Sequence, residues 1–199
     1  RYPDGTFVEG LSMYQGEVYT APKNDGRYGT LALLYYNKDL MEAAGLDPEL
    51  PPRTYAELRE FAERITIAGD GTAYGFIEGG KQTARWASSI GAMAMIGGAL
   101  NEDGIDLMTG EYRFHDPSVI AAIELLKSVQ DDGSYYPGYM AIDAREARAL
   151  FGLGRAGFII QGTWCIGPWK ANNPDLNFGA TFLPPPPSGR EGYIHARPN

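Results

Sequence analysis

Aromatic and amide side chains lie together near residue 160, and their types are those that bind sugars. Gln161, Gly162 and Trp164 come directly after the apolar run Phe158–Ile160. An indole ring stacks on the apolar C–H face of a pyranose, and amide groups match the sugar hydroxyls as donors and acceptors. A core tryptophan is more usual inside an element than beyond a strand end. We therefore expect Trp164 to form a stacking surface in a ligand cleft.

Other aromatic and polar residues occur at predicted loop and strand ends and could line the same cleft. They are Tyr28, Tyr36, Gln82, Arg85, Trp86, Asn101, Tyr139 and Trp169. Burial statistics favour a core position for Trp86 and Trp169 and a surface position for Tyr28 when each is considered alone. Trp164 is the exception on which the sugar-binding interpretation rests.

Motifs for other kinds of chemistry are missing or stand in the wrong context. His115 and His195 have no nucleophile or metal partner nearby in the sequence, and no HExxH, Walker or G-x-S-x-G pattern occurs. With Cys165 as the single cysteine, the chain has no disulfide framework and no thiolate metal cluster. Paired carboxylates such as Asp131 and Asp132 could support glycoside hydrolysis, so an enzyme remains an alternative.

Charge and hydropathy count against nucleic acid and membranes as partners. The 199-residue chain has 17 basic and 25 acidic residues and a net charge of −8. This balance disfavours nucleic acid and anionic membrane surfaces. The apolar run at 86–100 is too short to span a bilayer.

The stretch that positions Trp164 starts with a helix signal. Asp143 and Glu146 form a capping box, and apolar residues then recur at helical spacing up to Phe151. Gly152 and Gly154 end the helix, and a short apolar strand follows. With Gly157 these glycines match G-x-G-x-x-G, but the dinucleotide motif needs a strand before them and a helix after. We expect a plain turn between helix and strand, with the ligand beyond the strand's end.

The remaining elements follow from periodicity, caps and turn residues. We expect strands at Glu17–Ala21, Leu31–Tyr36, Tyr74–Ile77 and Asn177–Leu183, and a hairpin over Ile105–Met108 and Glu111–Phe114. We expect helices at Lys38–Ala44, Thr54–Gly69 (with a capping box from Thr54 to Glu57), Trp86–Ile96 and Asp116–Asp131, the last with Val119, Ile120, Ile123, Leu126 and Val129 facing inward. The polar loop Glu78–Ala84 is free to carry function. Strands alternating with amphipathic helices predict an α/β fold with a mixed, mainly parallel sheet.

Several segments together resemble the extracellular solute-binding proteins of ABC sugar importers, the group that includes maltose- and glycerol-phosphate-binding proteins. The resemblance covers most of the chain and lies in Gly16–Pro22 (GEVYTAP), Leu34–Leu40 (LYYNKDL), Ala44–Pro48 (AGLDP), Pro52–Leu58 (PRTYAEL) and Glu146–Trp164. It implies one lobe of a type II periplasmic-binding-protein-like fold, a three-layer αβα arrangement. In that family two lobes close on a ligand about a hinge.

The resemblance also implies a domain plan. Residues 1–30 would be the approach and first hinge crossing, 31–182 the nearly complete second lobe, and 183–199 the return crossing. Arg1 and the last residues up to Asn199 stand where no element begins or ends, so both ends look cut. The resemblance implies that most of the first lobe would be absent.

By the same resemblance, Trp164 is the stacking tryptophan, Gln161 and Gly162 are its neighbours, and Thr30 is a hinge-side contact. Gln82, Arg85 and Trp86 correspond to the family's ligand-contacting loop. The implied protein is an extracytoplasmic monomer, periplasmic or lipid-anchored, that delivers a carbohydrate to an ABC permease. It would have no catalytic residues, metal or cofactor. Alternatives are a glycoside-active enzyme, an interaction module, or a binding protein for a solute other than a sugar.

Overall fold

The computed structural model describes residues 7, 9, 12–19, 32–97 and 109–187. Its elements, in chain order, are β1 (Met13–Tyr14), β2 (Glu17–Val18), β3 (Leu33–Asn37), α1 (Lys38–Ala43), α2 (Tyr55–Gly69), β4 (Tyr74–Phe76), α3 (Thr83–Ile96), α4 (Pro117–Asp131), η1 (Tyr139–Ala141), α5 (Ala144–Gly152), β5 (Ala156–Gln161), η2 (Thr163–Cys165), α6 (Ile166–Asn172) and β6 (Phe178–Thr181). None of the helices among these residues is long and apolar enough to cross a membrane.

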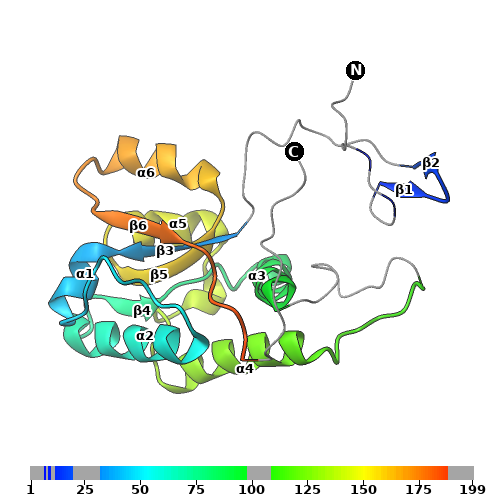
Figure 1. Ribbon diagram of the computed structural model, residues 1–199. Helices are drawn as coiled ribbons and strands as arrows, with labels where there is room; N and C mark the ends of the chain where they lie inside the picture. Colours follow the sequence, from blue (N-terminus) through cyan, green and yellow to red (C-terminus); the bar gives the residue numbers. More distant parts are fainter. Residues whose placement is uncertain (1–6, 8, 10–11, 20–31, 98–108, 188–199) are drawn as a thin grey trace.

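A mixed four-stranded sheet forms the middle layer, in the order β4-β5-β3-β6 (Figure 1). β4 pairs with β5 in parallel, whereas β3 is antiparallel to both β5 and β6. Three strands therefore run in one direction, as expected, but two of the three neighbouring pairs are antiparallel because the reversed strand lies inside the sheet. β1 and β2 form a separate two-stranded hairpin.

Helices cover both faces of the sheet, which gives the expected three layers. α5 and α6 lie on one face, and α2 and α4 lie on the other (Figure 1). Along β5, Phe158 and Ile160 pack into the core shared with α2, α3 and α4, while Ile159 packs with Phe151 and Trp169 beneath α5 and α6. All six residues of β5 are buried, as its uninterrupted apolar run predicts.

Local signals correctly predict most helix ends. Asp143 accepts hydrogen bonds from the backbone N–H groups of Arg145 and Glu146, and the Glu146 carboxylate accepts the N–H of Asp143 in return. Asn37 caps α1 and Asp116 caps α4. At α2, Thr54 accepts the N–H of Glu57, but Glu57 accepts from Arg53 and not from Thr54, so the second capping box is incomplete.

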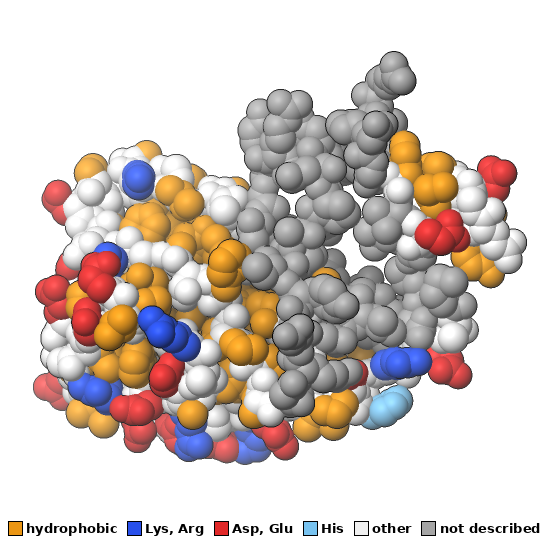
Figure 2. Space-filling view, viewed as in Figure 1, with side chains coloured by type: hydrophobic (Ala, Val, Ile, Leu, Met, Phe, Trp, Pro, Cys, Tyr) orange, Lys and Arg blue, Asp and Glu red, His pale blue; other side chains and the backbone are white. Residues whose placement is uncertain are grey.

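One expectation about apolar residues was wrong. Ile120 and Ile123 on α4 are 44% and 47% exposed, because the buried stripe of this helix follows Val119, Ala122 and Leu126. The hairpin expected over Ile105–Met108 and Glu111–Phe114 has its first arm outside the described residues, so it stays a prediction, and Glu111–Phe114 belongs to neither of the two described sheets. The visible outer face over α1, α2 and α4 mixes acidic and basic side chains (Figure 2).

Candidate functional site

The candidate site lies at the carboxyl ends of β4 and β5. These strands are parallel, so Gln161, the last residue of β5, and Glu78, two residues beyond β4, lie at the same edge of the sheet. Both residues are buried, with 1% of their surface exposed. A buried acid and a buried amide at strand ends are costly unless they are paired, so the surroundings of this edge decide its chemistry.

Glu78 is held by a compact polar network from the start of α3. One carboxylate oxygen accepts the backbone N–H of Gly79 and lies 3.6 Å from Nε of Arg85, and the other accepts the Ser89 hydroxyl at 2.8 Å. Burial raises the pKa of the Glu78 carboxyl, and the Arg85 guanidinium and these hydrogen bonds oppose that rise. The network is therefore a nearly buried ion pair, which depends on both partners.

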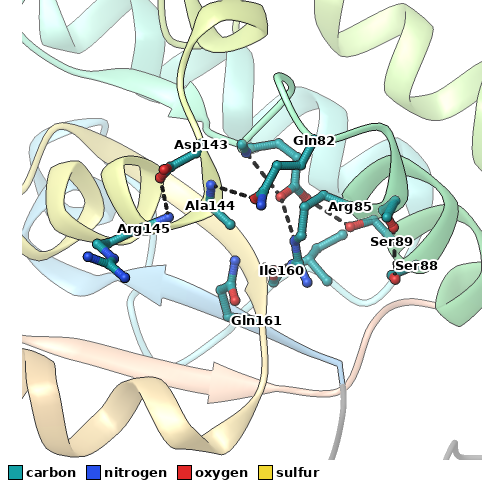
Figure 3. Close-up of polar contacts among 12 residues, drawn as sticks. Gln82, Arg85, Ser88, Ser89, Asp143, Ala144, Arg145, Ile160 and Gln161 are labelled. Carbon is teal, nitrogen blue, oxygen red and sulfur yellow. Dashed lines mark hydrogen bonds and ion pairs between the residues drawn. The ribbon is translucent and has the colours of Figure 1, made fainter.

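Arg85 and Gln82 join α3 to the two segments that position Trp164. The Arg85 guanidinium donates to the carbonyl oxygen of Ile160 in β5 at 3.2 Å. The Gln82 amide oxygen accepts the backbone N–H of Ala144 at the start of α5 at 3.0 Å (Figure 3). Both residues were predicted as ligand contacts, and in the structure both form hydrogen bonds to the protein backbone around the site.

The loop before α3, predicted to be a polar turn free to carry function, packs tightly against the start of α5. A side chain at Gly79 would approach backbone atoms of Ala144 to 2.4 Å, and one at Gly80 would approach the carbonyl oxygen of Tyr139 to 2.9 Å. Gly80 also donates its N–H to that oxygen. Glycine is needed at both positions because two backbone segments meet there.

Trp164 lies just beyond the carboxyl end of β5, in η2, and its side chain is accessible. Its exposed fraction is 46%, whereas Trp169 in α6 is 4% exposed and packs edge-on against Tyr35 in the core. Trp169 is thus a core residue, as burial statistics favour, and Trp164 is accessible beyond the strand end, while its stacking role stays a prediction. The Trp164 indole folds back over Gly162, where an added Cβ would lie 2.1 Å from the ring.

This close approach makes Gly162 a test of the ring's position. Gly162 has φ −90° and ψ 168°, which alanine also adopts, so a Gly162→Ala change should leave the backbone intact and displace the indole. We expect Gly162→Ala in the full-length protein to lower ligand affinity about tenfold, the loss of one aromatic contact, with little change in unfolding midpoint.

Gly167→Ala is the matched control, because a Cβ there meets nothing within 4 Å. Titration calorimetry and thermal unfolding of both variants would measure these effects. Equal affinity for Gly162→Ala and Gly167→Ala would mean that the orientation of the ring does not matter.

A cavity of about 320 Å³ opens beside Trp164, between α5 and α6. Its lining residues are Arg145, Arg148, Ala149, Trp164, Cys165, Pro168, Trp169 and Asn172. Cys165 is buried, and burial raises the pKa of its thiol. The Trp169 indole N–H donates to the carbonyl oxygen of Arg148, which fixes α6 against α5 along the cavity.

On the α3 side, an aromatic cluster borders the same polar edge. The rings of Tyr135 and Tyr139 stack with centroids 4.4 Å apart, and Trp86 packs against both. Within the described part of the chain, Trp86 Nε1, the Tyr135 hydroxyl and Gln161 Nε2 are buried without a hydrogen-bond partner. Buried polar atoms of this kind need an explanation, and a bound solute or ordered water would provide one.

The structure thus brings together part of the predicted set. Gln161, Gly162 and Trp164 share the end of β5, Arg85 reaches that strand, and Gln82 lies at α5, while the half-buried Trp86 faces Tyr135. Tyr28 and Thr30 lie outside the described residues. Sequence reasoning missed Glu78, although this residue directly follows a predicted strand. It also missed Arg145 and Arg148, although their spacing puts them on one face of a helix.

Comparisons with known proteins give consistent results. Residues 4–196 match the family described as bacterial extracellular solute-binding protein. A binding protein of Brucella abortus (strain 2308) is 31% identical over 192 residues, covering 94% of this chain and 44% of that protein. The sn-glycerol-3-phosphate-binding periplasmic protein of Salmonella typhimurium is 31% identical over 139 residues, covering 67% of this chain and 30% of that protein.

Among solved structures, a maltose-bound protein of T. maritima superposes with a TM-score of 0.68 at 25% identity, covering 94% of this chain and 46% of that one. The chain therefore spans less than half the length of these relatives.

Proposed function

The chain belongs to the family of bacterial extracellular solute-binding proteins, and on this premise we propose that it is part of the substrate-binding component of an ABC importer. Residues 31–182 would form the second lobe, with 1–30 and 183–199 providing the approach and the two hinge crossings. The whole protein would close around a carbohydrate and deliver it to the permease subunits. Its place outside the cytoplasm follows from the family.

One observation carries the carbohydrate proposal: a half-exposed indole at the carboxyl end of a buried strand. Trp164 is held there by its contact with Gly162 and lines a cavity. Stacking on a pyranose requires an accessible aromatic face, and polar groups nearby then fix the hydroxyls. Maltose in the T. maritima relative is consistent with this class of ligand.

The carboxylates named for the hydrolase alternative, Asp131 and Asp132, give it little support. Asp132 forms a two-point ion pair with Arg59, with Nε to Oδ2 at 2.6 Å, and Asp131 pairs with Lys127 on the same helix. Asp131 and Asp132 are thus both engaged in ion pairs at the end of α4. A solute other than a sugar is the stronger alternative, since one relative is named for glycerol phosphate.

The test is a calorimetric titration of the full-length protein with mono- and oligosaccharides, a polyamine and a short peptide. The proposal predicts binding of at least one sugar and of neither the polyamine nor the peptide. Incubation of the bound sugar with the protein, followed by chromatography, should return the sugar unchanged. Binding of the peptide or polyamine alone would exclude a carbohydrate ligand, and hydrolysis lost on a single Asp or Glu change would indicate an enzyme.

A further inference from the structure

Two arginines on α5 line the cavity beside Trp164. Arg145 and Arg148 are three residues apart, so they lie on one face of the helix. Within the described residues, neither guanidinium has a carboxylate within salt-bridge distance. Backbone N–H groups that bond to Oδ1 and, to a smaller extent, the Arg145 charge lower the pKa of the nearby Asp143 carboxyl. In a chain with a net charge of −8, the two arginines place two positive charges on the lining of one cavity, outside any salt bridge among the described residues.

Placing these two cations together costs energy unless an anion lies between them. Like charges three or four residues apart destabilise a helix. An oxyanion in the cavity would remove this repulsion and accept several charge-assisted hydrogen bonds, since the planar guanidinium matches phosphate and carboxylate groups in two-point contacts. The Asn172 side chain on the opposite wall can add a further donor.

The cavity also contains an apolar surface next to the charges. The Trp164 indole forms part of its wall, together with Pro168 of α6. At about 320 Å³ it is at the small end of the range for ligand pockets, which suits a single sugar ring or a shorter polyol. One wall can therefore stack on carbon while the other holds a negative charge.

We propose that the pocket formed by Arg145, Arg148 and Trp164 binds an acidic polyol, with its phosphate or carboxylate group on the arginines and its carbon skeleton on the indole. This inference rests on the proposed function and narrows the ligand class. It assigns Arg145 and Arg148 as the residues that select an acidic polyol over its neutral parent.

The test compares glucose, glucose 6-phosphate and glucuronate by titration calorimetry on the full-length protein. The acidic sugars should bind at least about tenfold more tightly than glucose, as expected for hydrogen bonds to charged groups. In Arg145→Gln/Arg148→Gln this preference should disappear, so that the acidic sugars bind no more tightly than glucose does to the same variant. A preference for glucose 6-phosphate identifies a phosphate ester as the group held, and a preference for glucuronate identifies a carboxylate.

Arg53→Gln/Lys127→Gln is the matched control, because it removes the same amount of positive charge from the other side of the sheet. Lys127 lies on α4, and Arg53 precedes Thr54 at the start of α2. Its preference for acidic sugars should equal that of the unmodified protein. Equal losses in the two double variants, or equal binding of glucose and the acidic sugars, would overturn the anion pocket and leave the proposed function standing. Failure of all sugars to bind would overturn both.

Discussion

Replacing Trp164 with alanine is expected to weaken sugar binding by the full-length protein about thirtyfold. Truncating a central aromatic contact typically costs about 2 kcal/mol or more in binding free energy, and 1.4 kcal/mol corresponds to a factor of ten in affinity. The side chain is 46% exposed, so the fold should tolerate the change. Titration calorimetry gives the affinity, and thermal unfolding checks that the protein remains folded.

Two further variants separate stacking from general apolar contact. Trp164→Phe keeps an aromatic face and should recover part of the lost affinity. Ile67→Ala removes a 72% exposed apolar side chain from α2, on the other side of the sheet, and should change nothing. Sugar affinity that is the same in Trp164→Ala and in the unmodified protein would remove the physical basis of the sugar-binding proposal.

Replacing Arg85 with methionine is expected to lower the free energy of unfolding by about 3 kcal/mol at neutral pH, because removing one partner leaves a buried charge without compensation. Glu78 would keep the Ser89 hydroxyl and the Gly79 N–H, but it would lose the cation 3.6 Å away. The hydrogen bond from Arg85 to the Ile160 carbonyl would be lost as well. Urea unfolding followed by circular dichroism would measure the change.

The pH dependence of this loss identifies its cause. Burial holds the pKa of Glu78 above its unfolded value, which is about 4.3 for glutamate, and loss of Arg85 would raise it further. A group with a raised folded pKa stabilises the protein below its unfolded pKa, and this contribution is lost as the pH rises through the folded pKa. The deficit of Arg85→Met should therefore be smallest below about pH 4 and grow toward pH 7.

Adding Glu78→Gln to Arg85→Met should restore much of the stability at pH 7, since the uncompensated charge is then gone. Arg59→Met, which breaks the more exposed pair with Asp132, is the control and should cost much less. A deficit in Arg85→Met that is independent of pH and of Glu78 would mean that packing, and not charge, accounts for it.

Much of the local structure could be predicted because its signals are local. The capping box at Asp143 and Glu146 involves residues three apart, and the strand that follows is buried on both faces, so its pattern is a plain apolar run. The turn at Gly154 has φ 70°, as a helix end with glycine at this position predicts. From these elements the position of Trp164 followed directly.

Features that depend on distant residues could not be predicted in the same way. Periodicity does not give strand direction, so the reversed β3 inside the sheet was not foreseen. The sequence does not reveal whether a neighbouring element covers an apolar residue on a helix, so the exposure of Ile120 could not be predicted. The pairing of Glu78 with Arg85 requires the turn between them to close, which sequence spacing alone does not establish.

A crystal structure of the full-length protein with its tightest-binding sugar tests the central claim most directly. The account predicts that the Trp164 indole lies flat against the carbon face of a sugar ring, with the ligand at the carboxyl ends of β4 and β5. A sugar bound elsewhere, with Trp164 still facing solvent, would contradict it.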